Sequence, residues 1–345
     1  MCRSRRSSLR RSARLAKLQP DRFACCIAAS LAGALLAACG PSSANPVAEP
    51  GSGPLATPPA GVVVAVGDKP EGIAYDPLSS ILAVGVRNPD AVLFLDRDGH
   101  LLRRVDVSSA PRHLRFAASG GPLLIPAENS GELDVVAVPA GARIERVRVG
   151  RQPHDVVQAD GRFFVTNEFS DTVSVIEGAG VIANLSAPAQ PGGIAATSGL
   201  VGVVGVRSHV LEVIDATSLQ KFASAAAGEG PTHVVAGAGY FYVVDTAGGA
   251  VLVFGSVPTV KLAVKIAVPG RPYGIAIDPE RNRLWITETA TNSLAEFAIN
   301  DSSIRLVATF ASVRQPNSVA VDPVTGRVFV TGTGDGVIQI LDPPD

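Results

Sequence analysis

The sequence predicts an all-β fold, a seven-bladed β-propeller with four-stranded blades whose last blade is closed by an N-terminal strand. Three observations predict this fold. A proline recurs every 38 to 44 residues, each unit that follows a proline contains short strand-like segments, and the last unit ends one strand early. Repeats of about forty residues with four strands each are typical of propeller blades. No helical periodicity competes with this pattern.

The repeating unit begins with a proline and continues as β-branched and aromatic runs bounded by turn residues. Gly274–Pro279 is a typical first strand, Leu284–Thr287 a second, Val251–Phe254 a third and Leu262–Val268 a fourth. The seven prolines that mark the units are Pro70, Pro111, Pro153, Pro191, Pro231, Pro272 and Pro316. We therefore expect seven blades.

The two ends of the repeat region predict how the ring closes. The seventh unit stops after its third strand, at Asp342, close to the end of the sequence. At the other end, Gly61–Gly67 precedes its proline just as the fourth strand Arg146–Gly150 precedes the next proline. We expect Gly61–Gly67 to complete the last blade, which leaves no open strand edge. The propeller domain would then span 61–345.

The segment Phe163–Glu177 carries a family resemblance. Phe164-Val-Thr-Asn167 followed by Thr172-Val-Ser-Val-Ile-Glu177 resembles the YVTN family of β-propeller repeats. Trp285–Glu288 and Val328–Thr331 are further matches, whereas Pro126 and Gly205 stand at the threonine position of blades two and four. The resemblance implies the propeller fold. It implies function only broadly, because the family includes surface proteins, ligand binders and relatives of enzymes.

The N-terminal region predicts export and a lipid anchor. Residues 1–22 are basic, and Phe23–Ala38 is an uncharged, largely apolar run that suits a signal-peptide core. Leu36-Ala-Ala-Cys39-Gly40 resembles the lipobox of bacterial lipoproteins, which implies cleavage after residue 38 and lipidation of Cys39. An ordinary signal peptide and an uncleaved anchor are the alternatives. Ser4–Arg10 resembles a twin-arginine motif, and the choice between export routes stays open.

The composition of the chain indicates where the protein is located and which partners it disfavours. Residues 39–60 are rich in Pro, Ser and Gly and predict an extended tether between the anchor and the propeller. We therefore expect the protein on the outer side of the bacterial cytoplasmic membrane or elsewhere in the cell envelope. Beyond residue 22 the chain carries 22 basic and 30 acidic side chains, a net charge of −8, which does not favour nucleic acid as a partner. No cysteine lies beyond Cys39, so the propeller has no disulfide.

One face of the predicted propeller gathers candidate binding residues. The first strands begin and the second strands end on the same face, around the central channel, and we call this the funnel face. Three of the five histidines of the chain belong to it. The candidate residues are Glu71, Arg112, His113, His154, Asp155, Asn167, Glu168, His233, Tyr273, Glu288 and Asn317.

These residues allow three interpretations. We expect a non-catalytic envelope protein that binds a ligand or protein partner on the funnel face, with no cofactor and no assigned catalytic residue. One alternative is a metal-dependent lyase or hydrolase in which His113, His154 and His233 hold a divalent metal. Blades two and five lie nearly opposite each other in the ring, which argues against one shared metal. The other alternative is a structural surface-layer component.

Overall fold

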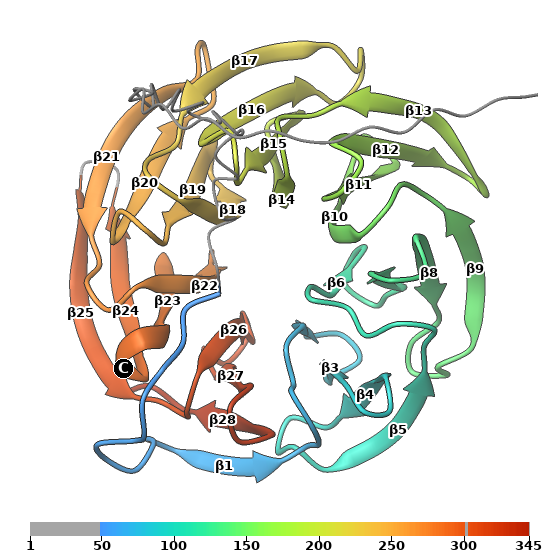
Figure 1. Ribbon diagram of the computed structural model, residues 1–345. Helices are drawn as coiled ribbons and strands as arrows, with labels where there is room; N and C mark the ends of the chain where they lie inside the picture. Colours follow the sequence, from blue (N-terminus) through green and yellow to red (C-terminus); the bar gives the residue numbers. More distant parts are fainter. Residues whose placement is uncertain (1–48, 301–302, 345) are drawn as a thin grey trace, which may run out of the picture. The chain divides into compact units, whose positions relative to one another are not determined.

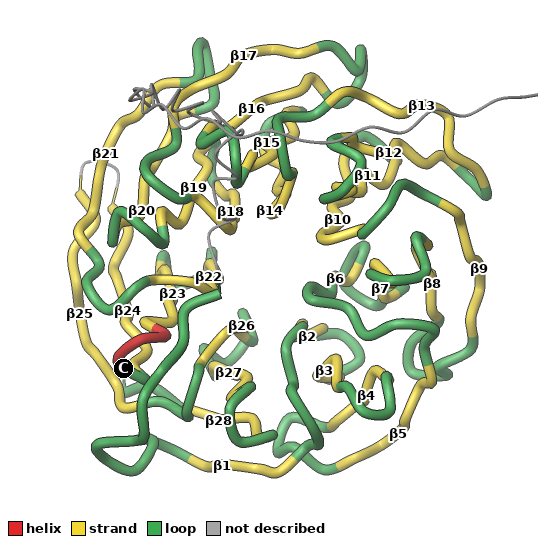
Figure 2. Tube along the Cα trace, in the orientation of Figure 1, coloured by secondary structure: helices red, strands yellow, loops and turns green. Residues whose placement is uncertain are grey.

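The computed structural model describes residues 49–300 and 303–344. In these ranges seven four-stranded antiparallel sheets stand around a common axis (Figure 1). Strands dominate the described part of the chain, and the one helix found there is the short 3-10 turn η1, Thr289–Thr291 (Figure 2). The described residues contain no helix that could span a membrane. The predicted signal peptide, 1–38, and Cys39 lie outside the described residues.

The strands of blades one to four follow the predicted pattern, and their order within each blade runs from the axis outward. Blade one contains β2 (Ile73–Asp76), β3 (Ile81–Val86), β4 (Ala91–Leu95) and β5 (Leu101–Asp106). Blade two contains β6 (Arg115–Phe116), β7 (Leu123–Ala127), β8 (Glu132–Val136) and β9 (Arg143–Arg148). Blade three contains β10 (Pro153–Ala159), β11 (Arg162–Asn167), β12 (Thr172–Glu177) and β13 (Gly180–Ser186). Blade four contains β14 (Pro191–Thr197), β15 (Leu200–Gly205), β16 (Val210–Asp215) and β17 (Lys221–Ala226).

Blades five to seven complete the ring. Blade five contains β18 (Pro231–Gly237), β19 (Tyr240–Asp245), β20 (Ala250–Gly255) and β21 (Lys261–Ala267). Blade six contains β22 (Pro272–Asp278), β23 (Arg283–Glu288), β24 (Ser293–Asn300) and β25 (Ser303–Ala311). Blade seven contains β26 (Pro316–Val321), β27 (Val328–Gly332), β28 (Val337–Leu341) and β1 (Val62–Ala65). The predicted seven-bladed fold is confirmed.

The last blade combines strands from both ends of the propeller. β1 pairs antiparallel with β28, with Val62 opposite Ile340 and Ala65 opposite Val337. β1 therefore supplies the fourth strand that the seventh repeat lacks, as the sequence predicts.

The part of the predicted tether that is described, residues 49–60, has no strand or helix and lies against the ring. Asn292 donates a hydrogen bond to the Gly53 carbonyl there (3.1 Å).

The hydrophobic core lies between the blades. Seven clusters of buried apolar side chains each join two neighbouring blades, so that every blade packs on both of its faces. Ile81 and Phe94 of blade one, for example, pack on Leu123 of blade two. This arrangement explains why the inner strands read as continuous apolar runs, since neither face of such a strand meets water.

A β-bulge recurs where the innermost strands begin. In blades three to seven this strand starts at the recurring proline, and its pairing with the second strand shifts within the next two residues. A bulge leaves its extra residue unpaired and re-aims the side chains around it. In blades one and two the innermost strands start later, β2 at Ile73 and β6 at Arg115. The residues that follow each proline are therefore free to point into the channel.

The residue directly after the second strand, which we call the bridging position, connects neighbouring blades. In blades five, six and seven it is threonine, and Thr246, Thr289 and Thr333 donate to the proline carbonyl of the next blade at 2.7 to 2.8 Å. The same register shows that Val204, and not Gly205, occupies the family threonine position of blade four. In chain order the bridging positions are Arg87, Glu128, Glu168, Val206, Thr246, Thr289 and Thr333.

Replacing a bridging hydroxyl by a methyl group should weaken the ring. Thr289→Val keeps the side-chain shape but removes the donor to the buried Pro316 carbonyl. We expect the free energy of unfolding to fall by about 1 to 3 kcal/mol, the usual cost of a buried group that loses its partner. Thr217→Val, at an exposed position, should change it by less than about 0.5 kcal/mol. Equal urea-unfolding curves for the two variants would contradict the bridging role.

Candidate functional site

Charged residues occupy the bridging positions of blades one, two and three, and those of blades one and two belong to a linked set of ion pairs at the channel mouth. Arg87 bonds Glu71 (2.8 Å) and Glu128 (3.2 Å). Arg112 places its Nε 2.6 Å from Glu128 Oε1. Burying charges is costly unless they are paired. These pairs therefore let one sector of the ring keep charged groups in the place of bridging threonines.

Glu168, the bridging residue of blade three, is held as a carboxylate. One oxygen lies 3.3 Å from His154 Nδ1, and the other accepts a hydrogen bond from Gln190 Nε2 at 2.8 Å. Burial acts to raise the pKa of Glu168, but these hydrogen bonds and the His154 and Arg112 charges outweigh it and hold the pKa at about 2. Because an ionised carboxylate only accepts hydrogen bonds, His154 donates from Nδ1, and in the neutral form of this ring Nε2 carries no proton.

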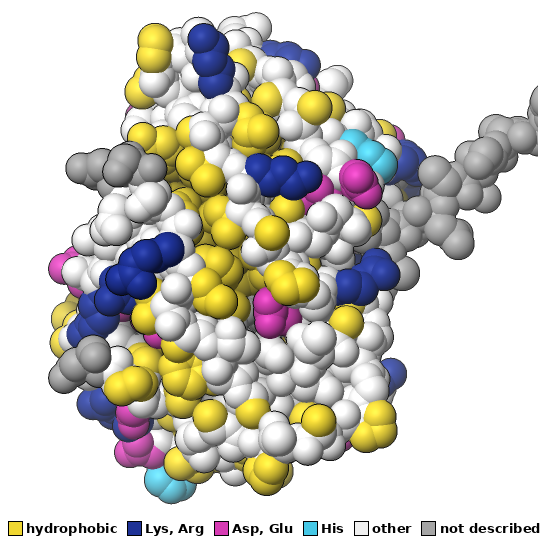
Figure 3. Space-filling view, turned by 90° about the vertical axis from the view of Figure 1, so that its left-hand side faces the viewer, with side chains coloured by type: hydrophobic (Ala, Val, Ile, Leu, Met, Phe, Trp, Pro, Cys, Tyr) yellow, Lys and Arg dark blue, Asp and Glu magenta, His cyan; other side chains and the backbone are white. Residues whose placement is uncertain are grey.

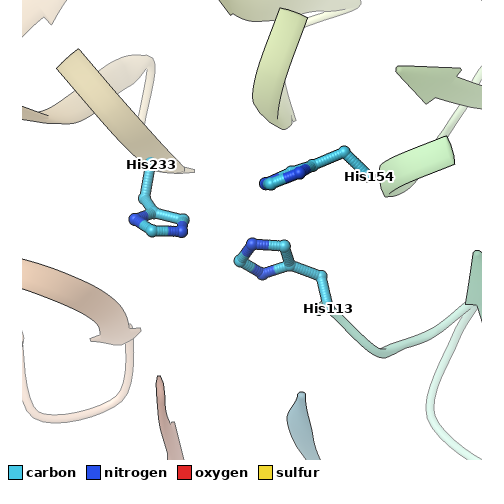
Figure 4. Close-up of side chains that lie close together, drawn as sticks. All are labelled: His113, His154 and His233. Atoms are coloured by element: carbon cyan, nitrogen blue, oxygen red, sulfur yellow. The ribbon is translucent and has the colours of Figure 1, made fainter. Parts of the chain in front are cut away.

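The three histidines of the funnel face meet in the channel (Figure 4). The ring centre of His113 lies 4.9 Å from those of His154 and His233, and the latter two are 6.4 Å apart. The expectation that opposite blades keep them apart was wrong. The reason is local, since β6 begins only at Arg115 and leaves His113 on a loop that extends inward from blade two.

Burial keeps two of these imidazoles neutral. Burial lowers the pKa of His113 to about 3, although the nearby Asp155 carboxylate opposes the shift. Burial also lowers the pKa of His233 well below its ordinary value, and the neighbouring imidazoles add to the effect. Neutral imidazole is the form that coordinates metal ions. It is also uncharged across the physiological pH range, so neither ring acts as a proton carrier near pH 7.

An ion pair lies inside the channel beside the histidines. Arg115 binds Asp155 through two nitrogens, at 3.1 and 3.3 Å, and also donates to the Ile194 carbonyl. Burial acts to raise the pKa of Asp155, but the Arg115 charge, together with the hydrogen bonds from Arg115 and the Ile194 amide, outweighs it and the pKa lies well below its usual range. Arg115, Asp155, His113 and His233 line a cavity of about 80 Å³.

Arg115 was missed in the sequence, although a signal was present. It stands four residues after its proline, where the other six blades carry small apolar residues, such as Ala74, Val157 and Ala276. One arginine among these apolar residues indicates a polar side chain in the channel wall. Glu49 was also missed, because it was assigned to the tether, and it bonds Gln315 and Asn317 at the channel mouth.

The remaining candidates divide between the channel and the blade interior. Tyr273 is buried and packs edge-on against His233 with ring centres 4.4 Å apart, and burial raises its pKa. Burial also raises the pKa of Glu288, at the end of β23. Asn167 is fully buried within blade three and bonds the Gly150 amide, Thr172 and Ser174. Its assignment to the funnel face is corrected, because all of these bonds hold the blade together.

A second hollow lies on the outer wall, away from the histidines. Hydrophobic side chains gather there between basic residues, as Figure 3 shows. The groove, of about 530 Å³, runs between blades five and six and is lined by Tyr240, Tyr242, Val264 and Ile304. No residue of the sequence-based candidate set lines it.

Comparison with solved structures supports the fold. Hydrazine synthase of Kuenenia stuttgartiensis matches with a TM-score of 0.69 and 16% identity, over 80% of this chain and 96% of that chain. Streptogramin B lyase matches with a TM-score of 0.68 and 14% identity, over 81% and 97%. The β-propeller domain of Cps50 (Swd1) of Myceliophteria thermophila gives 0.69 and 14%, over 82% and 99%. At these identities the similarity shows the β-propeller fold alone.

Sequence comparison gives no closer relative. No protein-family model matches the chain. No curated protein matches it either. Membership of the YVTN family therefore stays a prediction from the repeat residues.

The carboxylate of Glu168 should make stability depend on pH. Its folded-state pKa, about 2, lies below the ordinary value of 4.5, so its stabilising effect is present above pH 4.5 and is lost as the pH falls towards 2. In a metal-free buffer, Glu168→Gln should lower the free energy of unfolding at pH 7 by roughly 1 to 3 kcal/mol. The difference from the parent should shrink towards pH 2.

The same substitution at the exposed Glu229 is the control. Unfolding measured between pH 2 and 7 tests the assignment. A Glu168→Gln variant that loses the same free energy at every pH would contradict the buried, ionised state of Glu168.

Proposed function

We propose that this chain is a non-catalytic binding protein of the bacterial cell envelope, anchored through a lipid on Cys39, which takes a ligand or protein partner on its funnel face. The supporting observation is the sector of blades one to three where charged residues replace bridging threonines around His113 and His154. A propeller needs no charged residue at the bridging position to close its ring, as the threonines of blades five to seven demonstrate. We attribute the charged residues at the bridging positions of blades one to three to selection for binding.

A metal-dependent lyase or hydrolase is the second candidate. The convergence of three histidines favours it, since a metal with an open coordination position can polarise a substrate. General acid–base catalysis at neutral pH, however, needs a group whose pKa lies near 7. The pKa values of Glu168, about 2, and of His113, about 3, are far from that range. We therefore favour binding over catalysis.

The lipid anchor can be tested by cysteine replacement. In cells supplied with labelled palmitate, the parent should carry the label and sediment with membranes. Cys39→Ser should lose the label because the acyl chains attach to that thiol and to the amine that cleavage exposes. Cys26→Ser is the matched control and should be labelled like the parent. Label on Cys39→Ser at the parent's level would contradict the assignment.

Binding on the funnel face can be tested without knowing the ligand. Phe169 is 56% exposed on the loop between β11 and β12 beside Glu168, and Phe222 is 43% exposed on the outermost strand β17. Each is replaced by the photoreactive side chain p-benzoylphenylalanine in the full chain, and cells are irradiated. We expect a discrete adduct, read by mass spectrometry, at 169 and not at 222. Equal adducts at both positions, or none at 169, would contradict funnel-face binding.

A further inference from the structure

We propose that His113, His154 and His233 together bind one divalent transition-metal ion of the zinc type, inside the channel. The inference rests on the proposed funnel-face binding and specifies one ligand of that face. A coordinating atom from each residue lies within 4.8 Å of the other two. Zinc–nitrogen bonds of about 2.0 to 2.1 Å place two tetrahedral ligand atoms about 3.3 Å apart, so modest side-chain rotations would close the site.

The ring of His154 is oriented for coordination. Its Nδ1–H donates to the Glu168 carboxylate, which Gln190 holds in place from the other side. Metal-binding histidines usually donate their second ring N–H to a carboxylate or carbonyl in this way, which fixes the tautomer and raises the basicity of the coordinating nitrogen. In its neutral form His154 therefore presents Nε2 with a free lone pair.

A chain of hydroxyl groups fixes the tautomer of His233. Thr246 Oγ1 donates to the Pro272 carbonyl (2.8 Å), so it must accept the hydrogen bond from Thr232 Oγ1 (2.8 Å). Thr232 has then used its only proton and accepts from His233 Nδ1 at 3.1 Å. His233 thus carries its proton on Nδ1 and presents Nε2, as His154 does.

His113 supplies the adjustable ligand. It lies on the loop ahead of β6 and is more exposed than the other two histidines, which are 6% and 7% exposed. Its ring sits midway, with its centre 4.9 Å from each of theirs (Figure 4). Because its backbone is not part of a strand ladder, this residue can approach the ion without disturbing a blade.

The donor set selects the kind of metal. Three neutral imidazoles suit zinc and its neighbours, whereas calcium and magnesium prefer oxygen ligands. A second group, Glu128, His154 and Glu168, also has ligand atoms within 4.8 Å of one another. Its carboxylates are already engaged, Glu128 by Arg87 and Arg112 and Glu168 by His154 and Gln190. In the histidine-only set, the hydrogen bonds at Nδ1 leave Nε2 of His154 and of His233 available to the ion.

The surrounding charge tolerates a cation. Four carboxylates and three guanidinium groups lie around the histidines, so with neutral imidazoles one excess negative charge remains for a divalent ion to offset. The residues in this count are Glu71, Glu128, Asp155, Glu168, Arg87, Arg112 and Arg115. The cavity of about 80 Å³ beside His113 and His233 gives room for a fourth ligand such as water.

Zinc titration of the purified full chain tests the site. The chain is stripped with a chelator and titrated with Zn²⁺ against a chromophoric competitor. We expect one Zn²⁺ per chain, and a loss of affinity of about 100-fold or more in His113→Ala. Thr232→Val, which removes the acceptor of the His233 Nδ1 proton, should weaken binding about 10- to 100-fold. His100→Ala changes an exposed histidine outside the channel and should bind as the parent does.

Two results would overturn the proposal. One is a parent chain that binds no Zn²⁺ at one equivalent. The other is a His113→Ala chain that binds it as tightly as the parent. Thermal unfolding without metal shows whether each variant is folded, and His113→Ala is the primary test because its loop lies outside the strands. If zinc binding fails but the adduct at position 169 forms, the metal inference falls and funnel-face binding stands. If both fail, both proposals fall.

Discussion

The hydrogen bond from the bridging position to the next blade is the constraint on which this ring depends. Thr246, Thr289 and Thr333 each donate to a proline carbonyl of the following blade, and in blades six and seven that proline begins the bulged strand that turns side chains into the channel. Each bond adds a polar link to the apolar packing between two neighbouring sheets. The geometry of the channel wall therefore follows from contacts at the end of each second strand.

The candidate site lies in the blades that lack this threonine. At the bridging positions of blades one to three, Arg87, Glu128 and Glu168 replace threonine, and each is joined to a further charged or polar group across the channel mouth. Buried ion pairs contribute little net stability compared with apolar packing, and breaking one is costly. A sector built in this way is better explained by binding than by stability, and the histidines lie within it.

The sequence predicted the fold well because strand runs and recurring prolines are local signals. It predicted which residue types surround the channel, but not how they meet. The convergence of His113 on His233 depends on β6 starting late, which no local pattern shows. Asn167 resembles an exposed strand-end residue until its hydrogen bonds are known. Arg115 was predictable, because it interrupts a repeat position that is otherwise apolar.

We infer that three blades contribute to a single site in the channel. Crystals of the zinc-loaded chain, measured on both sides of the zinc absorption edge, test it most directly. We expect one anomalous peak at about 2.0 to 2.1 Å from Nε2 of His154, Nε2 of His233 and a ring nitrogen of His113. A zinc ion found elsewhere on the chain, with the three imidazole rings not coordinated to it, would contradict the single site in the channel.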